Sequence, residues 1–172
     1  MCADKTQVDE AIRVLYCHHH AITIALDVEY NYTLLPCWEQ GALAAMPSLT
    51  LSLLPETLAI CRLASDAPLP DWAAGEFLSI TRTSDESSVV CAERHVPPSV
   101  RCEKGWRCLK VAGPMDLSLI GILASLAFPL AEARIPLFAV STYATDYLLV
   151  KGADLERAVG VVRREGHTVH AR

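Results

Sequence analysis

Residues 136–151, PLFAVSTYATDYLLVK, decide the fold class of this chain because they predict two short apolar strands around a polar turn. The turn, Ser141–Asp146, is far richer in hydroxyl and charged groups than its flanks. Strands of this kind bury their side chains, so the polar groups at their junction need hydrogen-bond partners. The partner is either the backbone of the turn itself or a small polar ligand.

The segments on both sides of this hairpin extend the pattern. Upstream, Gly113–Asp116 follows a strand predicted over residues 106–111, and Asp116 is placed to N-cap a well-buried helix over residues 117–133. Downstream, Gly152–Asp154 begins an amphipathic helix, and Thr168–His170 is predicted as a last edge strand. Residues 106–170 therefore have the order βαββαβ. This α+β order is ferredoxin-like, with helices on one face of an antiparallel sheet.

The preceding residues predict a shortened copy of the same module. Strands are expected at Leu58–Leu63, Phe77–Thr83 and Ser88–Ala92, with almost no room for helices between them. We therefore expect tandem modules: an abbreviated one over residues 46–105 and a full one over residues 106–172. Residues 1–45 form an N-terminal extension, which either precedes a natural start at Met46 or folds onto the core.

Composition excludes several classes of function. The chain is 52% apolar and 20% charged, as compact domains are, and its net charge is −5 with no basic stripe for nucleic acid. No apolar run approaches the roughly 20 residues that cross a bilayer, and a secretory signal is lacking, so a cytoplasmic protein is expected. Seven cysteines without a CxxC pair indicate buried thiols rather than disulfides or a zinc site.

The sequence predicts neither a metal site nor an active site. Adjacent side chains such as those of Cys17–His20 cannot all reach one ion from a regular strand or helix. His95 and His167 are expected to be exposed loop residues. There is no nucleophile elbow, phosphate-binding loop or dinucleotide fingerprint, so we expect no cofactor and no enzymatic activity.

Three segments resemble the ACT domain family, in particular the small tandem-ACT proteins related to the CASTOR arginine sensors. They are FLSITRTSDESSVVCAE (77–93), GPMDLSLIGILASL (113–126) and EARIPLFAVSTYATDYLLVK (132–151). The resemblance implies a regulatory module that binds an amino acid or similar metabolite near a domain interface, and it allows a homodimer. It implies ligand contacts from Thr142, Tyr143 and Asp146, with the 113–116 loop as the other wall. This chain has two modules where the sensors have four.

The residues themselves suit an amino-acid zwitterion. A helix beginning after Asp116 would offer N–H groups to a carboxylate, and Gly113 would let the ligand approach the backbone. Asp146 can accept from an ammonium, and the hydroxyls of the turn, including Thr145, serve either charge. The expected ligand-binding residues are Gly113, Asp116, Ser141, Thr142, Tyr143 and Asp146. In the simpler interpretation Asp116 only caps the helix, and Asp146 and Thr145 only satisfy the turn.

The leading hypothesis is a non-enzymatic, cytoplasmic regulator that senses an amino acid at a module interface. The first alternative is an assembly module that dimerises through its sheets, with Tyr143 or Met115 filling a vestigial pocket. The second is a small enzyme, which would need a titratable pair such as His95 with Asp85.

Overall fold

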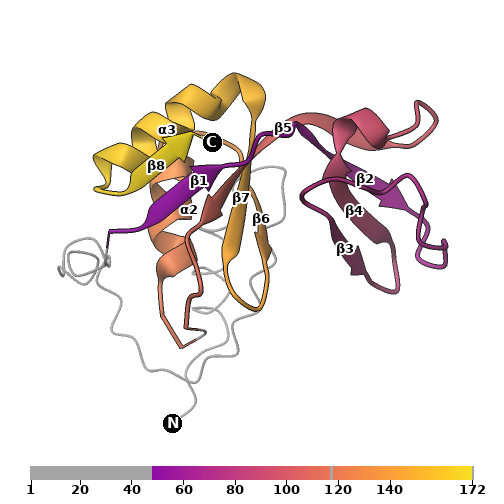
Figure 1. The fold of residues 1–172 in the computed structure, drawn as a ribbon, viewed down its shortest axis with the longest axis horizontal. Coiled ribbons are helices and arrows are strands. Elements are labelled where there is room, and N and C mark those ends of the chain that lie inside the picture. The colour runs from indigo at the N-terminus through magenta and orange to yellow at the C-terminus, as the bar shows by residue number, and fades with distance from the viewer. Residues whose placement is uncertain (1–47, 117, 172) are drawn as a thin grey trace, which may run out of the picture. The chain divides into compact units, whose positions relative to one another are not determined.

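The computed structural model describes residues 48–116 and 118–171, so the predictions for residues 1–45, including Cys17–His20, lie outside the described part. Within these described residues, eight strands and two α-helices make up an α+β fold (Figure 1). The strands are β1 (Thr50–Leu53), β2 (Leu58–Leu63), β3 (Ser79–Arg82), β4 (Ser87–Ala92), β5 (Cys102–Val111), β6 (Phe138–Ser141), β7 (Asp146–Lys151) and β8 (Thr168–Ala171). The helices are α2 (Ile122–Glu132) and α3 (Leu155–Arg164), with single 3-10 turns η1 (Glu93–His95) and η2 (Gly152–Asp154).

The hairpin that decided the fold class is formed as predicted. Strands β6 and β7 pair antiparallel around the polar turn, and β7 also pairs with β5. With α2 between β5 and β6, and α3 between β7 and β8, the C-terminal half has the predicted ferredoxin-like order. This part of the prediction is confirmed.

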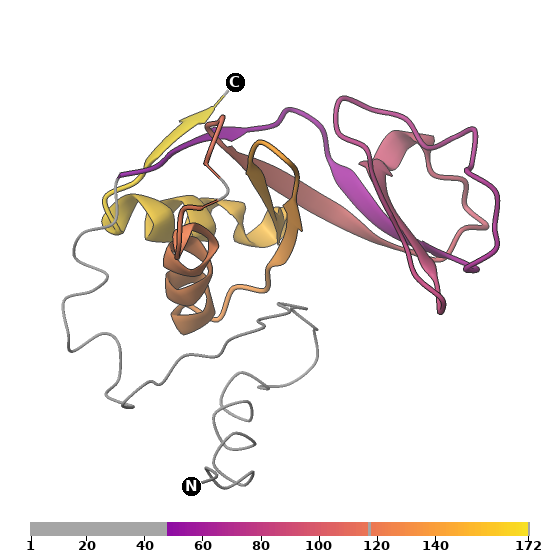
Figure 2. The same ribbon diagram turned by 90° about the horizontal axis from the view of Figure 1, so that it is seen from below.

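Strand β1 enlarges that arrangement. It lies between β5 and β8, antiparallel to the first and parallel to the second, so that Leu51 is opposite both Val111 and Val169. Figure 2 shows β1 running beside β8, with both helices on one side of the strands. A strand from the N-terminal half of the described chain therefore completes the sheet of the C-terminal half.

The main core fills the space between this sheet and the two helices. Leu51, Leu109 and Leu148 are fully buried on the helix-facing side, since alternate side chains of a strand share one face. From α3 the predicted apolar stripe supplies Leu155, Ala158 and Val162.

The opposite face of the sheet carries the intervening residues. Ser52 is opposite Lys110, and Lys110 is opposite Tyr147, so the three form one row across β1, β5 and β7. Beside this row, Leu54 and Phe77 belong to a second apolar cluster. Apolar clusters thus lie on both faces of the sheet, and the cluster on the face away from the helices is bordered by polar side chains.

In the N-terminal half of the described chain, β3-β4-β2-β5 form an antiparallel part of the same eight-stranded sheet, and this part is called the small sheet. The long strand β5 pairs with β2 through its first residues and with β1 and β7 farther on. Cys61, Cys91 and Cys108 are buried free thiols, as expected, and Cys102 is partly exposed. No helix among the described residues is long and apolar enough to span a membrane.

Helix α2 begins later than predicted. It starts at Ile122 rather than Leu117, and Gly121, with φ of 84°, occupies the N-cap position in a left-handed conformation that suits glycine. Asp116 therefore does not cap this helix, and the prediction that it would was wrong. The helix is also less buried than expected, because Phe128 is 46% exposed.

His167 was wrongly predicted to be an exposed loop residue. Its side chain is only 8% exposed, and its Nδ1 accepts a hydrogen bond from the Leu49 backbone N–H at 3.2 Å. The insertion of β1 beside β8 brings Leu49 to this position. His95, at the end of η1, is exposed as expected.

Candidate ligand-binding site

The hydroxyls of the polar turn are used largely by the turn itself. Thr142 Oγ1 donates to the Thr145 carbonyl at 2.9 Å and accepts from the Thr145 N–H at 3.3 Å. The Thr142 N–H donates to the same carbonyl at 2.9 Å. These bonds are the side-chain-to-backbone pattern that stabilises tight turns.

The other polar groups of the turn also have protein partners. Ser141 Oγ donates to Asp146 Oδ1 at 2.5 Å, and the buried Thr145 hydroxyl donates to the Val111 carbonyl at 2.6 Å. Tyr143 is 87% exposed and points away from the core. The protein therefore supplies hydrogen-bond partners for Ser141, Thr142, Thr145 and Asp146.

The loop after β5 lies directly against this turn. The Met115 N–H donates to the Ala144 carbonyl at 2.9 Å. A Cβ atom on Gly113 would lie 2.7 Å from the same carbonyl oxygen and 3.2 Å from Thr145 Cβ. The two predicted walls of the ligand site are therefore in contact, and the room that glycine leaves at position 113 is taken by the backbone of the turn.

Asp116 is exposed beyond that contact. Its Oδ1 accepts the Ser118 N–H at 2.9 Å, and this backbone bond lowers the pKa of Asp116. The carboxylate thus stabilises the local loop rather than a helix N-terminus.

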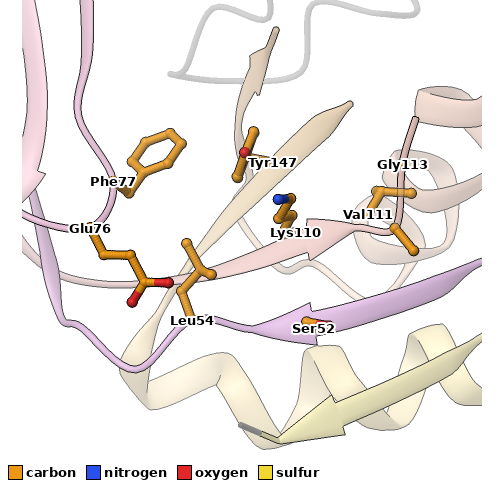
Figure 3. Close-up of a pocket in the computed structure, with 9 residues that line it drawn as sticks. Ser52, Leu54, Glu76, Phe77, Lys110, Val111, Gly113 and Tyr147 are labelled. Atoms are coloured by element: carbon orange, nitrogen blue, oxygen red, sulfur yellow. The ribbon is translucent and has the colours of Figure 1, made fainter. Parts of the chain in front are cut away.

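A cavity of about 290 Å³ opens beside the same loop, on the sheet face that points away from the helices. Figure 3 shows Glu76 and Phe77 on one side of it and Lys110 and Tyr147 on the other. The lining residues are Ser52, Leu54, Glu76, Phe77, Lys110, Val111, Ala112, Gly113 and Tyr147. Gly113 belongs to both the predicted site and this cavity; the other predicted residues do not line it.

Three strands and one anchored segment build the cavity. The row Ser52, Lys110 and Tyr147 forms its floor, because these residues are in register on one face of the sheet. The opposing segment is held by Glu56, whose Oε2 accepts the Glu76 backbone N–H at 2.7 Å.

Glu56 is in turn paired with Arg94 at 2.5 Å. Burial of the Glu56 carboxyl opposes its ionisation, but the bonds from Arg94 and from the Glu76 N–H outweigh it, so the pKa of Glu56 is lowered. An ionised Glu56 is thus an acceptor that fixes the segment at Glu76 and Phe77.

The cavity offers charges of both signs and an aromatic wall. Lys110 Nζ lies 5.7 Å from the centre of the Tyr147 ring, which in turn lies 4.7 Å from the Phe77 ring. An ammonium, a carboxylate, the Ser52 hydroxyl and two rings form a set that complements a small molecule with both charges and an apolar part. The described residues contain no group of three or more His, Cys, Asp or Glu side chains that could hold a metal ion.

Comparison with known proteins identifies the family. A model of the ACT domain matches residues 101–164, and a second model, of an N-terminal domain, matches residues 56–99. Protein Atu0741 from Agobacterium tumefaciens, whose crystal structure is known, is 38% identical in sequence to this chain. The structural match has a TM-score of 0.70 and covers 74% of this chain and 96% of Atu0741. The chain belongs to the ACT domain family.

Two further proteins are similar to parts of this chain. The bovine protein named "Cytosolic arginine sensor for mTORC1 subunit 1" is 30% identical over 108 residues, which are 56% of this chain and 33% of that protein. The chain thus spans about a third of the length of the curated relatives it matches. Aspartate kinase from Clostridium acetobutylicum shares the fold, with 10% identity and a TM-score of 0.52 over 67% of this chain and 34% of the kinase.

Proposed function

We propose that this ACT protein is a non-enzymatic regulatory module that binds an amino acid in the cavity between the sheet and residues 76–77. The observation that carries the proposal is the placement of Lys110 and Glu76 around one cavity of amino-acid size. Lys110 would bind the carboxylate of the ligand, and Glu76 would accept from its ammonium.

The size and lining of the cavity favour a ligand of this class. Its volume of about 290 Å³ is at the small end of ligand pockets, which typically span roughly 300–1,000 Å³. Leu54 and Phe77 are buried and present apolar surface, so a ligand with an aliphatic or aromatic part would gain from burial there. A nucleotide or a larger cofactor would exceed this space.

The ligand would regulate the protein by making contacts on two sides of the cavity. The ligand would bridge residues 76–77, within the predicted abbreviated module, and the sheet of the full module. A ligand that contacts both sides favours the conformations in which they are close, and this shifts the surface that a partner protein meets. The bovine relative is named as a cytosolic arginine sensor, which supports an amino-acid ligand and a cytoplasmic location for this chain.

The predicted contacts at Asp116, Ser141, Thr142, Tyr143 and Asp146 remain a second possible location. Bonds within the protein argue against a ligand at the turn, although exposed groups such as Thr142 can exchange partners. The assembly alternative, including a homodimer, also stays a prediction. Neither residue named for its filled pocket lines the cavity: Tyr143 is exposed, and Met115 packs against the main core.

A thermal-shift screen against the twenty amino acids tests the proposal. A ligand at 100 times its Kd adds about 2.7 kcal/mol to the stability of the folded chain. Lys110→Met should weaken binding of the hit about 10-fold to 100-fold, because a hydrogen bond to a charged group contributes about 1.5–3 kcal/mol.

Lys104→Met is the matched control, since it removes the same charge from an exposed position at the other end of β5. This variant should retain full affinity. A hit that survives Lys110→Met but is lost in Asp146→Asn would move the ligand to the turn.

A further inference from the structure

Three cysteines gather on one face of the small sheet, far along β5 from the cavity. Cys61 on β2 is directly opposite Cys102 on β5, and Cys91 on β4 is opposite Ala59, diagonal to Cys61. All three belong to one cluster of mostly buried side chains.

The hydrogen bonds of the sheet define how close Cys61 and Cys102 are. The Arg62 N–H donates to the Arg101 carbonyl at 3.0 Å. In an antiparallel pair, a bond between these flanking residues means that Cys61 and Cys102 form a non-hydrogen-bonded pair, in which Cα atoms are about 4.5 Å apart and side chains are closest. Disulfides form across Cα separations of about 4.4–6.8 Å. The backbone therefore needs little or no movement to join these two sulfurs.

The two thiols differ in access. Cys61 is 1% exposed, whereas Cys102 is partly exposed, so a small reagent would meet Cys102 first. Burial, together with the neighbouring thiols, raises the pKa of Cys61 to about 12, so Cys61 is the less reactive of the two thiols toward an external reagent.

We propose that Cys61 and Cys102 form a thiol–disulfide modification site that low-molecular-weight disulfides, such as oxidised glutathione, convert to a cross-strand disulfide. The Cys102 thiolate attacks one sulfur of the reagent, forms a mixed disulfide and releases one thiol. Cys61 then gives its proton to solvent and attacks the Cys102 sulfur, which releases the second thiol as its thiolate takes up a proton. Two cysteines are oxidised and one reagent disulfide is reduced to two thiols.

The Cys61–Cys102 disulfide would restrict the separation of β2 from β5. A Cys61–Cys102 bond would fasten β2 to β5, the long strand that also carries Lys110 and leads into Gly113. Because β2 pairs with β5 only near the start of that strand, a covalent link there would suppress separation of the small sheet.

Peptide mapping of the full chain tests the site. Cys2, Cys17 and Cys37 are replaced by serine, which leaves Cys61 as the one cysteine in the tryptic peptide that ends at Arg62. The folded protein is treated with oxidised glutathione, blocked with an alkylating agent, cut with trypsin and analysed by mass spectrometry. The expected product joins that peptide to Cys102–Lys104, is lighter by two hydrogen atoms than the sum of the free peptides, and disappears on reduction.

Two variants complete the design. Cys108→Ala removes a buried cysteine outside the cluster and should leave the linkage intact, whereas Cys102→Ala should leave Cys61 and Cys91 available for alkylation after denaturation. If either variant fails to fold, the map of the chain with all four of these cysteines still decides. A Cys61–Cys91 linkage, a Cys102 that remains a mixed disulfide, or full alkylation of Cys61 and Cys102 would each overturn the proposal.

Discussion

Replacing Gly113 by alanine tests the contact between the loop after β5 and the polar turn. The new Cβ would lie 2.7 Å from the Ala144 carbonyl oxygen, whereas ordinary contact is at about 3.5–4.0 Å, so one backbone segment must move by roughly 1 Å. The same carbonyl accepts the Met115 N–H, and that bond would lengthen with the movement.

The expected cost follows from these two effects. Overpacking costs about 1–3 kcal/mol, and weakening one hydrogen bond adds about 1 kcal/mol, while the stiffer unfolded chain returns about 0.4–1 kcal/mol. The net loss is about 1–3.6 kcal/mol, which at about 2–4 °C per kcal/mol lowers Tm by roughly 2–14 °C.

Differential scanning calorimetry of the variants measures this loss. Gly160→Ala is the matched control, because its Cβ would meet only the end of the Arg164 side chain at 3.6 Å and the position is inside α3. That change should raise Tm, since alanine favours a helix over glycine by about 0.5–1 kcal/mol. If Gly113→Ala were as stable as Gly160→Ala, the close approach of the turn to Gly113 would be refuted.

Two further predictions concern groups whose bonds were not evident from sequence. Thr145→Val should lower the free energy of unfolding in urea by about 1–3 kcal/mol, because it removes a buried hydroxyl bonded to the Val111 carbonyl; an unchanged midpoint would contradict this. Burial lowers the pKa of His167, so the unfolded chain binds more protons below about pH 6.5 and stability should fall as pH drops through that value. In His167→Asn, this part of the pH dependence of Tm should be absent; its persistence would assign the effect to another group.

The strands from β2 onward, and their order along the chain, could be predicted because each carries a local signal. Apolar alternation indicated β2 and β4, and the polar turn between two apolar runs indicated β6 and β7. The resemblance to the ACT family was likewise carried by contiguous segments.

Features that depend on distant partners escaped prediction. The four residues of β1 contain no information about whether they pair with β5 or β8, and the burial of His167 follows from that pairing. The start of α2 was missed because the apolar run continues through Gly121, whose left-handed conformation ends the loop.

The candidate cavity was missed for the same reason. Its residues come from four separate segments, and only Gly113 was chosen from sequence. One signal was present: Lys110 stands between Leu109 and Val111, which are both fully buried, so it had to occupy the other face of the sheet. Its neighbour Tyr147 and the segment at Glu76 become visible only in the fold.

The most direct test of the proposed function is isothermal titration of the best amino-acid hit from the thermal-shift screen into three proteins: the unmodified chain, Lys110→Met and Lys104→Met. We predict tight binding to the first and third and a Kd about 10-fold to 100-fold higher for Lys110→Met, as expected for a lost charged hydrogen bond. Equal affinity of Lys110→Met and the unmodified chain, or the absence of any amino-acid hit, would contradict binding in this cavity.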